Sequence, residues 1–160
     1  MTIELDPFNP RLPCECCGYP AIVAGVDRAD VFEPSQTLWG CRLCDWENVP
    51  LRPDGSPDPD APSAEERNGG FTLEQARANF RIHAWMYDPA KLEPWMAGPP
   101  TLDEMALRRA LRDAHEALRA TPDREQHEVW RQITEYESAL HDLSIRRAQA
   151  AEDEALPDDA

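Results

Sequence analysis

Four of the five cysteines form two pairs with the same internal spacing, Cys14-x-x-Cys17 and Cys41-x-x-Cys44. A tight turn of this length lets two thiolates point at one metal ion, and a following glycine such as Gly18 relieves the bend. Two such pairs would supply four sulfur ligands, which hold Zn²⁺ tetrahedrally at about 2.3 Å and leave no open coordination position. The spacing therefore predicts one structural Zn²⁺ bound by these four thiolates.

Other uses of the cysteines agree less well with the sequence. Iron accepts the same tetrahedral thiolate cage and is the main alternative metal. A thioredoxin-like redox role for Cys14 and Cys17 would need a βαβ context, which the flanking residues do not indicate. Cys16, the fifth cysteine, would be a reactive thiol only if it were exposed and of lowered pKa. We interpret it as a small residue packed within the turn.

No catalytic constellation accompanies the cysteines. The four histidines, at positions 83, 115, 127 and 141, are scattered, and neither an H-E-x-x-H nor a G-x-S-x-G motif is present. His83 is expected to have an ordinary packing or surface role, and Trp46-Glu47 to combine packing with a surface carboxylate. An enzyme that used the metal would need one of the four cysteines to lie off it. We therefore expect a protein that is not an enzyme.

The segments that must position the cysteines predict an α+β fold. Short β-type runs at residues 21–26 and 36–41 fit a small zinc-ribbon-like module. Residues 50–70 are acidic and rich in proline, so no regular structure is expected there, only a semi-stiff loop.

A helix is predicted over residues 72–87. Thr72 can cap it, and Gln75 stands at the position that a capping box requires. The candidates for its buried side are Leu73, Ala76, Phe80 and Trp85. Residues 1–87 together are expected to form one cysteine-rich, zinc-binding module.

The last sixty residues predict an antiparallel helical hairpin over residues 101–150. A proline-rich connection at residues 88–100 precedes it, and Thr121-Pro122 is expected to act as the N-cap and first residue of the second helix. Residues 151–160 are acidic and are expected to form a disordered tail. The apolar stripes consist of Leu107, Leu111, Ala114 and Leu118 in the first helix and Val129, Ile133, Tyr136, Leu140 and Leu143 in the second.

The polar positions of the hairpin predict a solvated surface. Four arginines that alternate with acids are assigned to it, namely Arg108, Arg109, Arg112 and Arg119. If the apolar stripes are wider than one hairpin can cover, a homodimer through the C-terminal helices is expected.

The formal net charge of −15 limits the choice of partners. Binding to a phosphate backbone depends on Lys and Arg, so nucleic acid is a poor partner for a chain in which no segment is basic. A basic protein would be attracted. No apolar stretch is long enough to span a membrane, and the first residues lack the features of a signal peptide, so a cytoplasmic protein is expected.

Residues 12–87 resemble the bacterial cysteine-rich CPCC family, whose pattern begins Cys-Pro-Cys-Cys-Gly-Tyr. The matching positions are Cys14, Cys16, Cys17, Gly18, Tyr19, Cys41, Cys44, Trp46, Glu47, Asn68, Gly69, Leu73, Ala76, Arg77, Asn79 and Phe80. Glu15 and Arg42 stand where the family usually has proline, which affects only the stiffness of each turn. The resemblance implies a small zinc-binding domain with no established activity.

These observations favour a non-catalytic zinc-binding protein that acts by protein–protein interaction. A concrete version is an immunity- or antitoxin-like protein that masks a basic partner such as a nuclease. One alternative is a metal-dependent enzyme with an open zinc site. The other is a nucleic-acid-binding zinc ribbon, which the acidic residues around the turns disfavour: Glu15, Asp45 and Glu47.

Overall fold

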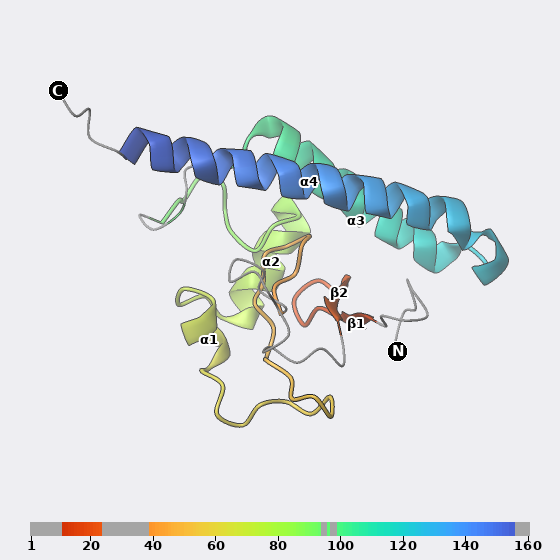
Figure 1. The fold of residues 1–160 in the computed structure, drawn as a ribbon, viewed down its shortest axis with the longest axis horizontal. Coiled ribbons are helices and arrows are strands. Elements are labelled where there is room, and N and C mark those ends of the chain that lie inside the picture. The colour runs from red at the N-terminus through yellow and green to blue at the C-terminus, as the bar shows by residue number, and fades with distance from the viewer. Residues whose placement is uncertain (1–10, 24–38, 94–95, 97–98, 156–160) are drawn as a thin grey trace. The chain divides into compact units, whose positions relative to one another are not determined.

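The computed structural model describes residues 11–23, 39–93, 96 and 99–155. Within these residues the elements are, in chain order, β1 (Arg11–Pro13), β2 (Pro20–Val23), α1 (Ala64–Arg67), α2 (Leu73–His83), α3 (Leu102–Ala120), the 3-10 turn η2 (Asp123–Glu125) and α4 (Gln126–Ala155) (Figure 1). The chain divides into two compact units, of which the first ends at Met86 and the second begins at Tyr87. The mixture of strands and helices agrees with the predicted α+β class.

β1 and β2 form a small antiparallel hairpin that encloses the first cysteine pair. Arg11 is paired with Val23 and Leu12 with Ile22, and the register becomes irregular after Leu12. The predicted strand at residues 21–26 therefore begins one residue early, and its last part lies outside the described residues. Most of the predicted strand at residues 36–41 also lies outside them, and its described end contributes one isolated bridge, between Gly40 and Glu47.

The acidic segment 50–70 is more ordered than predicted. Ser63 caps the one-turn helix α1 through a complete capping box with Glu66, and an isolated bridge joins Leu51 to Pro57. The prediction that no regular structure forms here is wrong, because the capping box satisfies the first N–H groups of a turn that prolines precede but do not interrupt.

Helix α2 begins as predicted and ends early. The side chain of Thr72 accepts a hydrogen bond from the N–H of Gln75, which completes the predicted capping box. The helix stops at His83 rather than at residue 87, because Ala84 adopts the left-handed conformation (φ 55°) and closes the last turn on Phe80. Ala76 is buried on the helix, whereas Trp85 is buried just beyond its end.

The second unit contains the predicted helical hairpin, with two corrections at its ends. Thr101 caps α3, but α4 begins at Gln126 because the turn Asp123–Glu125 follows Pro122. α4 then continues to Ala155, so the prediction of a disordered tail from residue 151 is wrong for its first five residues. Residues 156–160 lie outside the described part of the chain. None of the helices described here contains an apolar stretch of the length that spanning a membrane requires.

The predicted apolar stripes are largely buried. The buried aliphatic side chains of the hairpin include Leu111, Leu118, Ile133 and Leu140. Charged and titratable side chains are buried among them, namely Glu104, Arg108, His115 and Glu137. The hairpin therefore has a partly polar interior.

Arg108 corrects the prediction for the arginine-rich surface. Arg108 is 1% exposed, whereas the charge pattern predicts that it lies on the solvated face. At 3.6 residues per turn, Arg108 lies on the same side of α3 as Glu104, Leu111 and His115, so the helical period carries it inward with the apolar stripe.

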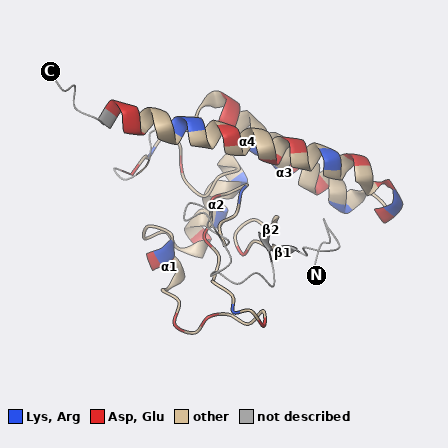
Figure 2. Ribbon diagram, in the orientation of Figure 1, with Lys and Arg blue, Asp and Glu red and all other residues tan. Residues whose placement is uncertain are grey.

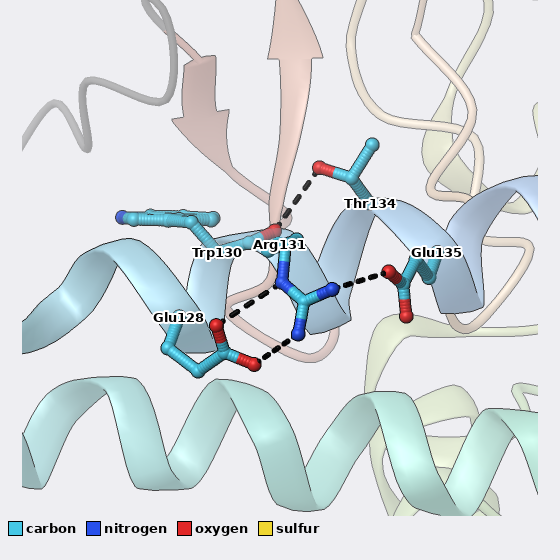
Figure 3. Close-up of polar contacts among 5 residues, drawn as sticks. All are labelled: Glu128, Trp130, Arg131, Thr134 and Glu135. Carbon is cyan, nitrogen blue, oxygen red and sulfur yellow. Dashed lines mark hydrogen bonds and ion pairs between the residues drawn. The ribbon is translucent and has the colours of Figure 1, made fainter.

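Several ion pairs lie on the exposed surface of the hairpin. Figure 2 shows acidic and basic residues interspersed along α3 and α4. Near the start of α4, Arg131 lies between Glu128 and Glu135, with Nε 3.1 Å from Glu128 Oε2 and Nη1 3.3 Å from Glu135 Oε1 (Figure 3). Thr134 donates a hydrogen bond to the carbonyl of Trp130. These groups are exposed, so each pair contributes little to stability and mainly keeps the surface hydrated.

Candidate metal centre

The two cysteine pairs lie on turns that have the same backbone hydrogen bonds. In the first turn, the N–H of Cys14 donates to the carbonyl of Tyr19 (2.7 Å) and the N–H of Gly18 donates to the carbonyl of Cys14 (2.8 Å). In the second, the N–H of Cys41 donates to Trp46 (2.8 Å) and that of Asp45 to Cys41 (2.8 Å). The common spacing in the sequence therefore produces a common turn.

Each turn ends in a residue with a left-handed backbone. Gly18 has φ 75°, which glycine adopts without steric cost. Asp45 has φ 68° at the equivalent position, and aspartate is one of the few other residues that tolerates this conformation. Its carboxylate accepts a hydrogen bond from Trp85 Nε1 at 2.7 Å, so the segment that follows α2 supports the second turn.

The four predicted ligands come together. Their sulfur atoms all lie within 4.8 Å of one another, and the Sγ–Sγ distances across the two turns are 3.7 Å for Cys14–Cys44 and 3.6 Å for Cys17–Cys41. All of these are free cysteines. Four sulfurs about 2.3 Å from a central ion would be about 3.8 Å apart in a tetrahedron. The four residues are thus close enough to bind one metal ion.

The surroundings of the sulfurs favour a bound cation. Cys14, Cys41 and Cys44 are at most 3% exposed, and Cys17 is half-buried. Burial raises the pKa of Cys41 and of Cys44, whereas hydrogen bonds, first from Cys17 and then from Cys41 and Cys44, lower the pKa of Cys14. Several thiolates buried this close together repel one another and require a positive ion among them.

Aromatic side chains and the end of α2 enclose the second turn. Trp46 is fully buried, and its Nε1 donates to Glu15 Oε2 at 3.2 Å. The N–H of Met86 donates to the carbonyl of the ligand Cys44 at 2.9 Å. From α2, Arg77 donates through Nη2 to the carbonyl of Glu15 at 2.7 Å. α2 is thus hydrogen-bonded to the first turn, and the segment that follows it is hydrogen-bonded to the second.

Cys16 is not one of the four clustered sulfurs, although its side chain interacts with that of Cys44. It is 8% exposed and is not a member of the set that surrounds one point. This burial agrees with its interpretation as a small packed residue. Among the histidines, His83 ends α2 and is half-buried, His115 is buried in the hairpin, and His127 and His141 are exposed. Within the described residues, the metal-binding cluster consists of cysteines alone.

Two buried asparagines beside the cysteine turns were missed in the sequence. Asn48 and Asn68 are 0% and 3% exposed, and their side chains bind backbone groups of other segments. Asn68 lies in the matched part of the CPCC pattern, so the resemblance was a signal for that position. For Asn48 no motif exists, and only its place shortly after the second cysteine pair could have drawn attention.

No family model, no curated protein and no solved structure matches this chain. The resemblance to the CPCC family and the zinc-ribbon assignment therefore stay predictions.

Proposed function

We propose that this chain is a non-catalytic zinc-binding protein that acts by protein–protein interaction. The observation that carries the proposal is the position of four cysteine sulfurs within 4.8 Å of one another, on two turns with the same hydrogen bonds. Four thiolates fill a tetrahedral coordination sphere, so neither a substrate nor an activated water finds an open position. A site of this kind stabilises a fold rather than catalysing a reaction.

Zinc is the metal that the donor set favours. Closed four-sulfur sites in proteins are typical of structural Zn²⁺, although iron accepts the same cage. Zinc would also supply folding free energy to a unit that has few regular elements. Reduced, unpaired thiols persist in a reducing compartment, which supports a cytoplasmic location.

A basic protein is the proposed partner. The chain has a formal net charge of −15, and its acidic loop exposes Asp54, Asp60, Glu65 and Glu66. Such a surface attracts a cationic partner and accelerates its approach. An immunity- or antitoxin-like protein that masks a basic nuclease fits this chemistry, whereas the phosphates of a nucleic acid would be repelled.

Metal analysis tests the zinc site. One zinc per purified chain is expected, and Cys41→Ser should abolish tight binding because it leaves three thiolates. Cys16→Ser is the matched control, since it makes the same change close to the site and should retain one zinc per chain. Tight zinc binding that survives Cys41→Ser would contradict the closed four-sulfur site, and stoichiometric iron would contradict the choice of metal.

Affinity capture from the native host tests the partner. A basic protein should be retained at low ionic strength and released as salt is added, because screening weakens the attraction. Replacement of Asp54 and Asp60 by asparagine should weaken its retention. Recovery of no specific partner, or of a partner whose binding is insensitive to salt, would contradict the proposed interaction.

A further inference from the structure

One fully buried side chain connects the two cysteine turns to each other. Asn48 is 0% exposed. Its Oδ1 accepts a hydrogen bond from the backbone N–H of Glu15 at 2.8 Å, inside the first turn. Its Nδ2 donates to the carbonyl of Trp39 at 2.9 Å, just before the second turn. The backbone N–H of Asn48 donates to the same carbonyl at 2.9 Å, which fixes the side chain at its base.

The hydrogen bonds of Asn48 lie next to the residues that set the spacing of the four sulfurs. Glu15 directly follows the ligand Cys14, and Trp39 lies two residues before the ligand Cys41. The first and last of the four ligands are 30 residues apart, and the sulfur contacts of 3.7 Å and 3.6 Å both run from one turn to the other. A group that fixes the backbones of the two cysteine turns relative to each other therefore also fixes the distances between the four sulfurs that one metal ion would bind.

We propose that Asn48 is a positioning residue for the metal, which sets how tightly the four cysteines hold it; this inference rests on the proposed zinc site. Asn48 itself contributes no ligand. It acts by preorganising the two turns, so that fewer degrees of freedom are lost when the ion binds. Because an amide has an acceptor and a donor at the end of one short arm, it suits a position between an N–H and a carbonyl.

Asn68 provides a matched control within the same unit. It is also a buried asparagine: its Oδ1 accepts from the N–H of Glu47 at 2.8 Å, and its Nδ2 donates to the carbonyls of Glu47 (3.0 Å) and Ala64 (2.9 Å). These bonds attach the segment after the second turn to α1 and do not reach the first turn. Loss of Asn68 should therefore lower stability without changing the distance between the turns.

Competition with a chromophoric chelator for Zn²⁺ tests the proposal on the full chain. Asn48→Ala should weaken zinc binding by about 10- to 100-fold, the usual effect of removing a group that orients metal ligands. Asn68→Ala should leave the affinity within about 3-fold of the wild type on the same scale. Equal affinity of Asn48→Ala and the wild type, or equal losses in both variants, would overturn the assignment.

A second variant and a second readout separate positioning from folding. Asn48→Ser keeps a short polar side chain that is too short to reach both turns, and it should release zinc faster than the wild type when challenged with excess chelator. With Co²⁺ in place of zinc, its visible spectrum should shift from that of the wild type, whereas the spectrum of Asn68→Ala should not. Unchanged release and an unchanged spectrum in Asn48→Ser would reject the positioning role. A wild-type chain that binds no zinc would instead refute the proposed function itself.

Discussion

The two units of this protein reach a stable fold by different means. In the first, the described strands and helices are short, and the buried residues are mainly cysteines, aromatic side chains and asparagines joined to backbone groups. In the second, helices of 19 and 30 residues form their own backbone hydrogen bonds and bury a continuous seam. The first unit contains four cysteines that lie close enough to bind one metal ion, whereas the second is built on the packing of two long helices.

The two units also differ in the partners of their buried polar side chains. Around the cysteine turns, the buried amides of Asn48 and Asn68 bind backbone donors and acceptors, and four sulfurs lie within 4.8 Å of one another. In the hairpin, a carboxylate and a guanidinium compensate each other: Arg147 Nε is 2.9 Å from Glu104 Oε1, and the side chain of Glu104 is fully buried. The two units should therefore respond to different perturbations.

Removal of the metal should have the largest effect, and only on the first unit. Structural zinc typically contributes about 10 kcal/mol to the folding of a small domain. A strong chelator, or Cys44→Ser, should expose the buried tryptophans Trp39, Trp46 and Trp85 and shift their fluorescence to the red. The far-UV circular dichroism of α3 and α4 should persist. If the fluorescence shift and the loss of circular dichroism occur together, the hairpin also depends on the metal. If neither signal changes, the first unit does not depend on the metal, and the proposed difference between the units is wrong.

Disruption of the partly buried ion pair between Arg147 and Glu104 should destabilise only the hairpin. Arg147→Met leaves the carboxylate of Glu104 buried without this partner, which should cost about 3 kcal/mol in the free energy of unfolding. Arg146→Met, which changes an exposed neighbour, should cost less than about 0.5 kcal/mol. Urea unfolding followed by circular dichroism measures both. Equal effects of the two substitutions would contradict a stabilising role for the pair.

Acidification should weaken the hairpin through His115. Burial, and to a lesser degree the nearby charge of Arg119, lowers the pKa of His115 from 6.5 to about 4. The unfolded chain therefore binds the proton first, so the contribution of neutral His115 is complete above pH 6.5 and is lost as the pH falls toward 4. At about pH 4.5 the loss should be about 2 kcal/mol.

The comparison of His115→Gln with the wild type measures this effect. Urea unfolding of the hairpin at several pH values should show a smaller loss of stability on acidification in the variant, because glutamine does not titrate. Parallel pH profiles for the two proteins would contradict the assignment to His115.

Loss of a helix cap should have the smallest effect. Thr72→Ala removes the oxygen that accepts from the N–H of Gln75 at 3.2 Å and should destabilise α2 by about 1 kcal/mol. Thr134→Ala, which removes an exposed hydroxyl bonded to the carbonyl of Trp130, should be nearly neutral for the hairpin. Hydrogen exchange of the α2 and α4 amides can measure both. A larger increase in α4 exchange caused by Thr134→Ala than in α2 exchange caused by Thr72→Ala would contradict the expected order.

Local rules predicted the parts of the structure that depend on local spacing. The two cysteine pairs, the Thr72 cap and the stripe of Leu111, Leu118, Ile133 and Leu140 all follow from residues a few positions apart. The capping box of Ser63 and Glu66 in α1 obeys the same local rule and forms directly after Pro62, the last proline of the acidic segment.

The remaining features depend on contacts between distant segments. Asn48 contacts Glu15, 33 residues away, and the left-handed Asp45 is supported by Trp85, 40 residues away. Neither contact follows from a helical or strand repeat in the sequence, so neither could be predicted from spacing. The burial of Arg108 could not be predicted from its charge, because an arginine is buried only where the folded chain compensates that charge.

X-ray absorption spectroscopy at the zinc edge identifies the atoms bound to the metal. Four sulfur neighbours at about 2.3 Å and no nitrogen or oxygen ligand are expected. The same shell should be found in Cys16→Ser, since Cys16 lies outside the four-sulfur cluster. Three sulfurs with a nitrogen or oxygen ligand would contradict the closed four-sulfur site. The metal would then have a coordination position that a substrate or water could occupy.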